Sequence, residues 1–365
     1  MRFPEFSGEW ESNELHKVAS LSKGAGISKD QLSDSGHPCI LYGELYTKYK
    51  SEIIREVYSK TQLDVANLVK SHTNDVIIPC SGEAAIEIAT ARCVLIPDVL
   101  LGGDLNIIRL NGRHDGGFFA YQLNGKRKVD IAKVAQGVSV VHLYGEHLKK
   151  VKVAYPSLEE QQKISSFLAL LDERIATQIK IIEKLESLIK GLCQKLTQQD
   201  NPNTALNETL VCYSSTLQES SVQEAGDYPV YGATGVCGYT NAPEVDGDSI
   251  LIIKDGASVG VTYYASGKYS AIGTLNRLVA KRGYSLRYLY YCLKVFNFAP
   301  YRTGLAIPHI YFRDYGKAKV WCPSLDEQQR IADALSKVEQ KIAIEKSLLE
   351  QLYSQKRFLL QAMFI

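Results

Sequence analysis

Residues 156–168 read PSLEEQQKISSFL, and nearly the same phrase, PSLDEQQRIADAL, returns at residues 323–335, 167 positions later. A phrase that returns within one chain usually marks a repeated structural unit. The fold therefore depends on what each copy begins and on what lies between the two copies.

Each phrase has the pattern of a helix start. Ser157 and Glu160 in the first copy, and Ser324 and Glu327 in the second, have the spacing of a capping box. In a capping box the serine side chain accepts a hydrogen bond from the amide three residues later, and the glutamate bonds back to the serine amide. The proline before each serine keeps the helix from extending further toward the N-terminus. Two helices are therefore predicted to begin at these serines.

Apolar residues follow each cap at alternating steps of four and three. This spacing, sustained over nearly five heptads, predicts a coiled-coil seam in which the two helices pair. At about 1.5 Å per residue, a helix of roughly 40 residues is about 60 Å long. The first seam comprises Ile164, Leu168, Leu171, Ile175, Gln178, Ile182, Leu185, Ile189, Leu192 and Leu196. The second comprises Ile331, Leu335, Val338, Ile342, Glu345, Leu349, Leu352, Lys356, Leu359 and Met363.

One polar residue occupies the same repeat position in each seam, Gln178 in the first and Glu345 in the second. If the helices pack antiparallel along their full length, these two side chains meet near the centre and fix the register, a role that buried polar residues have in coiled coils. The alternative is that each helix simply tolerates one polar residue. Both interpretations are open at this point.

The segments between the helices are related as well. Residues 136–158, QGVSVVHLYGEHLKKVKVAYPSL, align without a gap with residues 303–325, TGLAIPHIYFRDYGKAKVWCPSL. Further back, NDVIIPCSGEA (residues 74–84) resembles GDSILIIKDGA (residues 247–257). The chain is therefore expected to alternate variable domain, helix, variable domain, helix.

Within the variable domains, β-branched and aromatic runs are broken by Gly, Asn and Asp and are joined by helical pieces such as SLRYLYYCLKVF (residues 285–296), which indicates mixed structure. QQDNPNTALNET (residues 198–209) has the composition of a linker. The predicted fold class is α+β, with two mixed α/β domains joined by two long helices that form an antiparallel coiled coil, related by a pseudo-two-fold internal repeat. The predicted bounds are 1–155 and 200–322 for the domains, and 156–199 and 323–365 for the helices.

The composition, with 45% hydrophobic and 22% charged residues, is that of an ordinary globular protein. A membrane span is not expected, because the chain has no run of 18 apolar residues, and its first residues lack the apolar core of a signal peptide. The eight cysteines include no C-x-x-C pair, which argues against a zinc or redox site. Reduced cysteines in a cytoplasm fit this pattern best.

A net charge of +2 does not by itself indicate nucleic-acid binding, but the charge is unevenly distributed. Between Lys268 and Lys319 there are ten Lys/Arg and one acid, and between Lys126 and Lys152 there are seven Lys/Arg and two acids. Fourteen of the 22 tyrosines lie between Tyr213 and Tyr315. Basic islands of this kind are either solvated faces or phosphate-binding surfaces.

Two similar but non-identical domains on a rigid helix pair suit a partner that offers two distinct sites at a set spacing. Duplex DNA is such a partner, because a rod of about 60 Å matches fewer than about twenty base pairs. Since the two domains differ in sequence, the two DNA half-sites should differ too. The expected target is bipartite and asymmetric.

These features resemble the specificity subunit of type I restriction–modification enzymes, over essentially the whole chain. The resemblance rests on the paired P-S-L-[ED]-E-Q-Q helix starts, on YPVYGATG and GDSILIIKDGASVG, and on G-x-x-x-x-H ahead of each helix. PEFSGEWE (residues 4–11) and HPCILYGEL (residues 37–45) also look like openings of that family's first recognition domain.

The resemblance implies two target recognition domains, each reading one half of a split DNA site, and helices that dock methylation subunits, with restriction or translocase subunits in the full complex. It implies that this chain is not catalytic and holds no cofactor, so that S-adenosylmethionine, ATP and Mg²⁺ would bind to the partner subunits. The residues agree, since the chain has neither the Pro-Pro dipeptide expected of an adenine methyltransferase nor a G-x-x-x-x-G-K-[ST] phosphate loop. No metal site is predicted, because His142 and His309 have no carboxylate or cysteine at metal-ligand spacing.

DNA recognition needs cations at phosphates and hydrogen-bonding side chains at base edges. For each candidate below, the alternative is an exposed charge or a packed tyrosine. In the first domain the predicted contacts are Lys23, Lys29, Tyr42, Tyr46, Lys48 and Arg92. In the second they are Tyr231, Tyr239, Lys254, Lys268, Arg277, Arg302 and His309.

Apolar helix residues outside the seams would suit helices of the methylation subunits, or would pack on the recognition domains. They are Phe167, Leu170, Ile181, Leu188, Leu348 and Phe358.

Two other functions fit parts of the pattern. A stand-alone sequence-specific DNA-binding protein would bind DNA tightly without partner subunits. A coiled-coil scaffold with two protein-binding modules would show no DNA binding and no steep dependence on salt.

Overall fold

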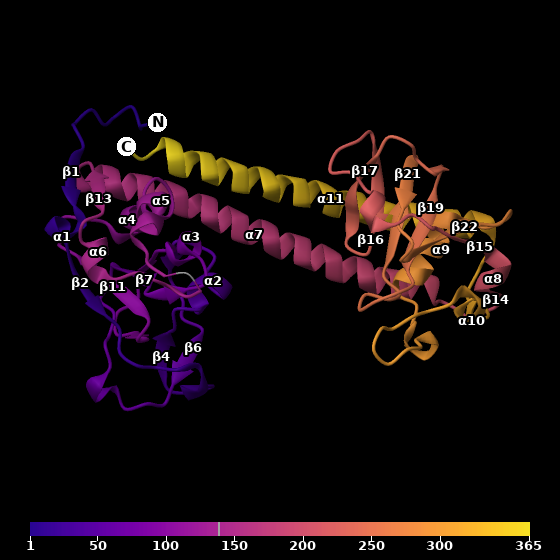
Figure 1. Ribbon diagram of the computed structural model, residues 1–365, viewed down its shortest axis with the longest axis horizontal. Coiled ribbons are helices and arrows are strands. Elements are labelled where there is room, and N and C mark those ends of the chain that lie inside the picture. Colours follow the sequence, from indigo (N-terminus) through magenta and orange to yellow (C-terminus); the bar gives the residue numbers. More distant parts are fainter. Residues whose placement is uncertain (138) are drawn as a thin grey trace. The chain divides into compact units, whose positions relative to one another are not determined.

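The computed structural model describes residues 1–137 and 139–365. The chain divides into two compact units (Figure 1). Unit 1 comprises Met1–Ile179 and Ser347–Ile365, and unit 2 comprises Lys180–Lys346. Each long helix therefore contributes one half to each unit, whereas the sequence interpretation treated the helices as separate segments.

The two predicted long helices are present, and they are antiparallel. In unit 1 the first half of α7 shares a hydrophobic core with the second half of α11, with Leu168 and Leu359 among its members. In unit 2 the second half of α7 shares a core with the first half of α11, with Ile189 and Leu335 among its members. The helices are α7 (Leu158–Thr197) and α11 (Leu325–Ala362).

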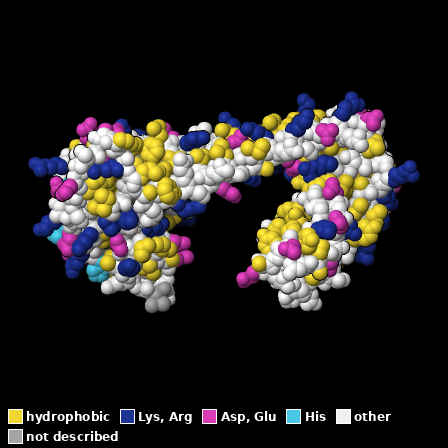
Figure 2. Space-filling view, turned by 90° about the horizontal axis from the view of Figure 1, so that it is seen from above, with side chains coloured by type: hydrophobic (Ala, Val, Ile, Leu, Met, Phe, Trp, Pro, Cys, Tyr) yellow, Lys and Arg dark blue, Asp and Glu magenta, His cyan; other side chains and the backbone are white. Residues whose placement is uncertain are grey.

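The predicted seams are confirmed, because every seam position is buried or partly buried. Gln178 and Glu345 are among the buried ones, and Glu345 forms an ion pair of 2.5 Å with Lys341 one turn earlier on α11. Their role in fixing the register stays a prediction. Outside the seams, hydrophobic and basic side chains are intermixed at the helix surface (Figure 2).

The serine half of each predicted capping box is present. The backbone N–H groups of Glu160 and Glu327 donate to the Oγ atoms of Ser157 and Ser324, at 3.4 Å in both helices. The predicted bond from Glu160 back to the amide of Ser157 is wrong for the first helix. The buried Glu160 carboxylate instead accepts two hydrogen bonds of 2.7 Å from Arg2. A bidentate guanidinium satisfies both carboxylate oxygens, which one backbone amide cannot do.

Unit 1 is built on a mixed five-stranded sheet with β7 at its centre. All five residues of β7 are buried, as expected of an apolar strand covered on both faces. The sheet has the order β2 (Ala19–Lys23), β11 (Leu105–Leu110), β7 (Asp75–Pro79), β9 (Arg92–Val94), β5 (Ile53–Ile54). A second sheet has the order β10 (Leu100–Leu101), β4 (His37–Ile40), β6 (Ser59–Thr61), β3 (Leu32–Ser33). Two-stranded pairs and short helices complete it: β1 (Glu11–Glu14) with β13 (Lys152–Tyr155), β8 (Ser81–Gly82) with β12 (Val141–His142), α1 (Leu15–Val18), α2 (Glu44–Thr47), α3 (Ala85–Ile88), α4 (Gly116–Asn124), α5 (Lys128–Val134) and α6 (Gly145–Leu148).

Unit 2 repeats the central part of this plan. The buried strand β19 takes the place of β7, and α9, at the predicted helical piece, takes the place of α4. Its first sheet has the order β15 (Leu210–Ser214), β22 (Leu275–Ala280), β19 (Ser249–Ile253), β20 (Thr262–Ala265). Its second has the order β17 (Gly235–Thr240), β16 (Tyr228–Gly232), β21 (Lys268–Ala271), β18 (Val245–Asp246). The remaining elements are β14 (Thr204–Ala205) with β23 (Lys319–Val320), α8 (Leu206–Thr209), α9 (Leu286–Lys294) and α10 (Phe312–Tyr315).

The segment predicted as a linker, residues 198–209, is only partly one. Helix α7 ends at Thr197, but β14 and α8 already belong to the fold of unit 2. The polar composition misled the prediction, because β14 pairs with β23, a strand more than a hundred residues away.

One glutamine attaches each long helix to its domain. In unit 1, Gln161 accepts a 3.0 Å hydrogen bond from the backbone N–H of Asp115, the N-cap of α4, and donates a 2.9 Å bond to the carbonyl of Pro156. In unit 2, Gln328 makes the same two bonds, both at 2.9 Å, to the N-cap residue of α9 and to the proline before its own helix. Both glutamines are buried. This explains why the repeated phrase keeps a glutamine at this position.

A tyrosine–carboxylate bond repeats in the same way. The hydroxyl group of Tyr121 on α4 donates to Asp172 on α7 at 2.8 Å, and that of Tyr291 on α9 donates to Glu339 on α11 at 2.8 Å. The two units are therefore held to their helices by equivalent polar contacts, although their sheets differ in size.

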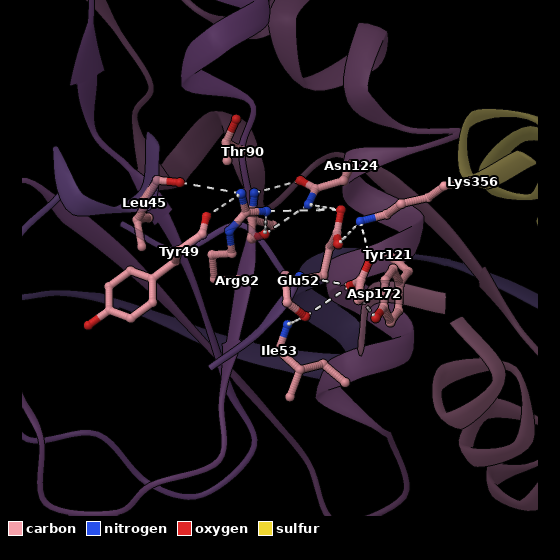
Figure 3. Close-up of polar contacts among 12 residues, drawn as sticks. Leu45, Tyr49, Glu52, Ile53, Thr90, Arg92, Tyr121, Asn124, Asp172 and Lys356 are labelled. Atoms are coloured by element: carbon pink, nitrogen blue, oxygen red, sulfur yellow. Dashed lines mark hydrogen bonds and ion pairs between the residues drawn. The ribbon is translucent and has the colours of Figure 1, made fainter. Parts of the chain in front are cut away.

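In unit 1 this contact belongs to a buried ionic network (Figure 3). Lys356 of α11 lies 2.5 Å from Asp172 of α7 and also bonds Glu52, next to β5. Arg92 of β9 lies 4.0 Å from Glu52, and Asn124 donates to the same carboxylate at 3.2 Å. The network therefore joins both long helices to the sheet of unit 1.

Burial and charge compete in setting the pKa values of this network. Burial raises the pKa of Glu52 above its ordinary value, although Lys356 opposes the shift. Burial acts the same way on Asp172, but the Lys356 ammonium and its hydrogen bonds hold the pKa of Asp172 below the ordinary value. Burial lowers the pKa of Lys356, but the two carboxylates raise it by more, so this ammonium stays charged. The network is stable only while all its charges have partners.

Candidate nucleic-acid interface

A groove in unit 1 brings together three of the predicted DNA contacts, Lys29, Tyr42 and Lys48. Its volume is about 990 Å³. Tyr42 and Lys29 are exposed at the groove, and Lys48 forms a 2.7 Å ion pair with the buried Glu44 of α2. The other lining residues are Gly26, Ile27, Ser28, Gln31, Leu32, Leu41, Gly43, Thr47, Gly102, Gly103 and Asp104.

This groove combines the groups that DNA readers use. Ammonium groups can bind phosphates, Tyr42 offers an exposed ring, and Gln31 and Asp104 offer hydrogen-bonding groups. At the groove the backbone at Gly24 approaches the backbone at Gly102 so closely that a side chain at Gly24 would collide with it. The groove is therefore the surface of unit 1 that best fits the predicted contacts, which stay predictions.

The other three predicted contacts of unit 1 lie elsewhere. Lys23 is exposed on β2, where it is opposite Asn106 of β11. The hydroxyl group of Tyr46 is buried, and burial raises its pKa. Arg92 is a correction: it is 8% exposed, and its guanidinium donates to the carbonyls of Leu45 and Tyr49 at 3.3 and 3.0 Å. A guanidinium held inside the sheet does not reach a DNA phosphate.

In unit 2, three predicted contacts lie on two neighbouring loops. Lys254 begins the loop after β19, and its carbonyl accepts a 2.9 Å bond from the backbone of Ile310. His309 Nδ1 lies 2.7 Å from Asp255 of the same loop. Arg302, on the second loop, is exposed and donates to the carbonyl of Val259 at 3.1 Å. The fold therefore places Lys254, Arg302 and His309 on two loops that are hydrogen-bonded to each other.

Three more predicted contacts belong to the second sheet of unit 2. Tyr239 on β17 and Lys268 on β21 are exposed, and Lys268 lies 5.8 Å from the ring centroid of Tyr228. Tyr231 on β16 is half-buried and packs edge-on against the buried Tyr269 at 5.6 Å. Tyr231 is therefore at least in part a packing residue.

Arg277 has a partner that the sequence analysis did not single out. Tyr213 of β15 is directly opposite Arg277 of β22, and the guanidinium carbon lies 4.3 Å from the ring centroid. Tyr213 is exposed. A guanidinium stacked on an exposed ring is held in a preferred orientation, which suits a bidentate contact to guanine. Only the alternation of LVCYS (residues 210–214) pointed to an outward-facing tyrosine.

The predicted docking residues, which are the apolar helix residues outside the seams, differ in exposure. Phe167, Leu170, Ile181, Leu188 and Phe358 are exposed, whereas Leu348 is partly buried against the core of unit 1. Phe167 is also in edge-on contact with Phe3, at 5.7 Å between ring centroids. Exposed Ile344 and Tyr353 on α11 were missed by the sequence analysis.

Within residues 1–137 and 139–365, no group of three or more His, Cys, Asp or Glu residues is placed to hold a metal ion. In the same described residues, no helix combines the length and the apolar character needed to cross a membrane. Burial raises the pKa of all eight cysteine thiols.

Comparison with known proteins gives a consistent result. The family model for the type I restriction modification DNA specificity domain matches residues 7–187 and 213–354. The chain is similar to the putative type I restriction enzyme MjaX specificity subunit of Methanocaldococcus jannaschii, with 26% identity over 204 residues, covering 53% of this chain and 46% of the relative. It is also similar to the type I restriction enzyme EcoprrI specificity subunit of Escherichia coli, with 26% identity over 115 residues, covering 32% of this chain and 29% of the relative. The match spans less than half the length of either relative.

Two solved structures show the same fold. The type I restriction–modification S subunit from M. genitalium superimposes with a TM-score of 0.67 at 18% identity, over 100% of this chain and 99% of that one. A chain from a structural study of complex assembly and conformational transition in the type I system superimposes with a TM-score of 0.59 at 15% identity, over 98% of this chain and 97% of that one.

Proposed function

Because the chain belongs to the family of type I restriction modification DNA specificity domains, we propose that it is the DNA-recognition subunit of a type I restriction–modification complex. Units 1 and 2 each read one half of a bipartite, asymmetric target. The chain itself carries out no chemical step, and it positions the methylation and restriction subunits on the DNA.

The observation that best supports this function is one scaffold used twice with different exposed side chains. Gln161 and Gln328 make the same attachments in the two units. The candidate DNA contacts differ, however: unit 1 offers the groove with Tyr42, and unit 2 offers the Arg277–Tyr213 pair. A common frame with different reading surfaces suits two different half-sites.

The partner subunits belong to the same proposal. Exposed apolar residues on α7 and α11, such as Leu170 and Phe358, support docking of methylation subunits on these helices. S-adenosylmethionine, ATP and Mg²⁺ then bind to the methylation and restriction subunits. The complex acts in the cytoplasm, where its DNA lies.

The first test is a modified-base map of cells that express this chain with its neighbouring methylation subunit. We expect a split, asymmetric motif with methylated adenine in both halves, and we expect this motif to disappear when the chain is deleted. A map that the deletion leaves unchanged would contradict the proposal.

Two other outcomes identify the alternatives. A chain that binds one DNA sequence tightly without partner subunits, and that does not direct methylation, is a stand-alone DNA-binding protein. A chain whose interactions do not depend on DNA or on salt is a protein scaffold.

Binding to DNA should weaken steeply with salt, and three basic residues of unit 2 should account for part of the slope. Replacing Lys254, Lys268 and Arg302 together by glutamine is expected to reduce the slope of log K against log [salt] by about 2–3, because each phosphate contact contributes about 0.9. The measurement is a salt titration of binding to a duplex that carries the mapped motif.

The matched control is Lys337→Gln, since Lys337 is exposed on α11 and is not among the candidate contacts. This variant should keep the wild-type slope. An unchanged slope in the triple variant would exclude these three side chains as phosphate contacts.

A further inference from the structure

The motif G-x-x-x-x-H forms a pinned hairpin in unit 2. Thr303 and His309 exchange two backbone hydrogen bonds, of 2.9 and 2.8 Å. Gly304 has φ +89°, and a side chain there would collide with the carbonyl oxygen of Ile307. Only glycine readily accepts this geometry, so the sequence fixes the turn.

The base of this hairpin is anchored to the loop that follows β19. The carbonyl of Pro308 accepts a 2.9 Å bond from Gly256, and Asp255 lies 2.7 Å from His309 Nδ1. On the preceding side, Arg302 is tied to Val259, as described above. The hairpin therefore projects from a base that is held on both sides.

The tip of the hairpin is apolar and exposed. Leu305 has a relative exposure of 109%, and Ile307 one of 57%. Exposed single leucines are ordinary, but here two exposed aliphatic residues belong to one turn and are separated only by Ala306. Such a tip would bury its apolar side chains in a binding partner.

The residues that flank the same motif in unit 1 are paired in the same way. Gln136 and His142 exchange backbone hydrogen bonds of 2.9 and 2.7 Å. Gly137 has φ +125°, and a side chain there would collide with the carbonyl oxygen of Val140. Val140 is exposed at this tip, while residue 138 lies outside the described residues. The paired ends and the glycine with positive φ are thus present in both units.

The surroundings of the tips favour DNA as the molecule that they enter. Both hairpins lie inside the basic islands of the chain, residues 126–152 with seven Lys/Arg and two acids, and residues 268–319 with ten and one. In unit 2, Arg302 and Lys254 flank the base of the hairpin. The nearby acidic residue, Asp255, is paired with His309. Basic residues at the base of a hairpin with an apolar tip would let a protein hold phosphates while it inserts an apolar side chain at a base step.

We propose that the hairpin of unit 2 is a wedge that inserts Leu305 and Ile307 between base pairs of the bound duplex. This inference rests on the proposed function, and it deepens it, because it adds readout through DNA deformation to the direct contacts. Base steps that unstack easily would then be preferred at the position of the wedge.

The test uses a closed circular plasmid carrying the motif found in the modified-base map. Topoisomerase relaxes the plasmid in the presence of the purified complex of the full-length chain with its methylation subunit, and the change in linking number is measured after the protein is removed. Insertion at a base step untwists the duplex, so we expect the wild-type chain to lower the linking number. Leu305→Ser with Ile307→Ser should lose most of this shift.

Two controls separate the wedge from a folding defect. Val236→Ser with Val261→Ser removes two exposed apolar side chains of unit 2 outside the hairpin and should keep the full shift. Leu305→Met retains an apolar tip and should keep it too. If the double serine variant melts at a lower temperature than wild type, the single Leu305→Ser variant replaces it.

Three outcomes would count against the proposal in different ways. A serine variant that binds DNA and shifts the linking number like wild type overturns the wedge. A variant that is normal on DNA but no longer copurifies with the methylation subunit assigns the tip to a protein contact, which also overturns it. A wild-type chain that binds no DNA at any salt concentration even in complex with its methylation subunit removes the proposed function itself.

Discussion

Replacing Lys356 by methionine is expected to lower the free energy of unfolding by about 3–5 kcal/mol, because it leaves two buried carboxylates without their shared ammonium. Glu52 and Asp172 are 5% and 6% exposed, so water does not replace the lost partner. Arg92, at 4.0 Å from Glu52 and with its guanidinium on backbone carbonyls, compensates only in part. The measurement is the shift in the denaturant midpoint of the full-length chain.

The matched control is Lys346→Met, ten residues earlier on the same helix. Lys346 pairs with Glu186 at 2.6 Å, but both side chains are about half exposed, 55% and 48%. Exposed pairs contribute about 0–1 kcal/mol, so this variant should unfold close to wild type. Equal effects of the two substitutions would show that the network in Figure 3 has no special role.

The effect of Lys356→Met should also depend on pH. Because the folded-state pKa of Asp172 is depressed, its ionised form stabilises the fold above its unfolded-state pKa, and this contribution is lost as the pH falls through the folded-state value. Glu52 has a raised pKa and acts in the opposite sense, since protonating it relieves a buried charge. The difference between wild type and variant should therefore shrink in acid, where the carboxylates no longer need the ammonium.

Replacing Gln161 by alanine is the second change with a large expected effect. It leaves the backbone N–H of Asp115 and the carbonyl of Pro156 without their partner, where α4 meets the start of α7. An unsatisfied buried polar group costs about 1–3 kcal/mol, so the loss of two partners should cost about 2–6 kcal/mol. Thermal and denaturant unfolding of the full-length chain would measure it.

The repeated phrase supplies its own control. The next residue, Gln162, is exposed, so Gln162→Ala should change the unfolding free energy by less than about 0.5 kcal/mol. Gln328 makes the equivalent bonds in unit 2, and its neighbour Gln329 is also exposed. Gln161→Ala and Gln328→Ala should be additive, because the two sites share no residue. Equal losses at Gln161 and Gln162 would reject the role given to the buried glutamine.

Among the candidate DNA contacts, the sequence does not distinguish exposed from buried side chains. Lys254, Arg302 and His309 are predicted contacts that lie on two neighbouring loops, and their contact with DNA stays a prediction. Arg92, another predicted contact, is buried, because β9 lies inside the sheet between β7 and β5. Charge is a local property of the sequence, but exposure depends on which strands become neighbours.

The sequence by itself determined the two helices, their serine caps, their antiparallel seams and the repeat of one domain plan. These features depend on contacts between residues three or four apart, or on matching phrases, and both are visible along the chain. The tertiary structure alone decided that Lys356 in the seam meets Glu52 and Asp172, that Tyr213 stacks on Arg277, and that His309 lies against Asp255. Each of these depends on segments far apart in the chain being packed together, and the burial that results, rather than the residue type, sets what each side chain can bind.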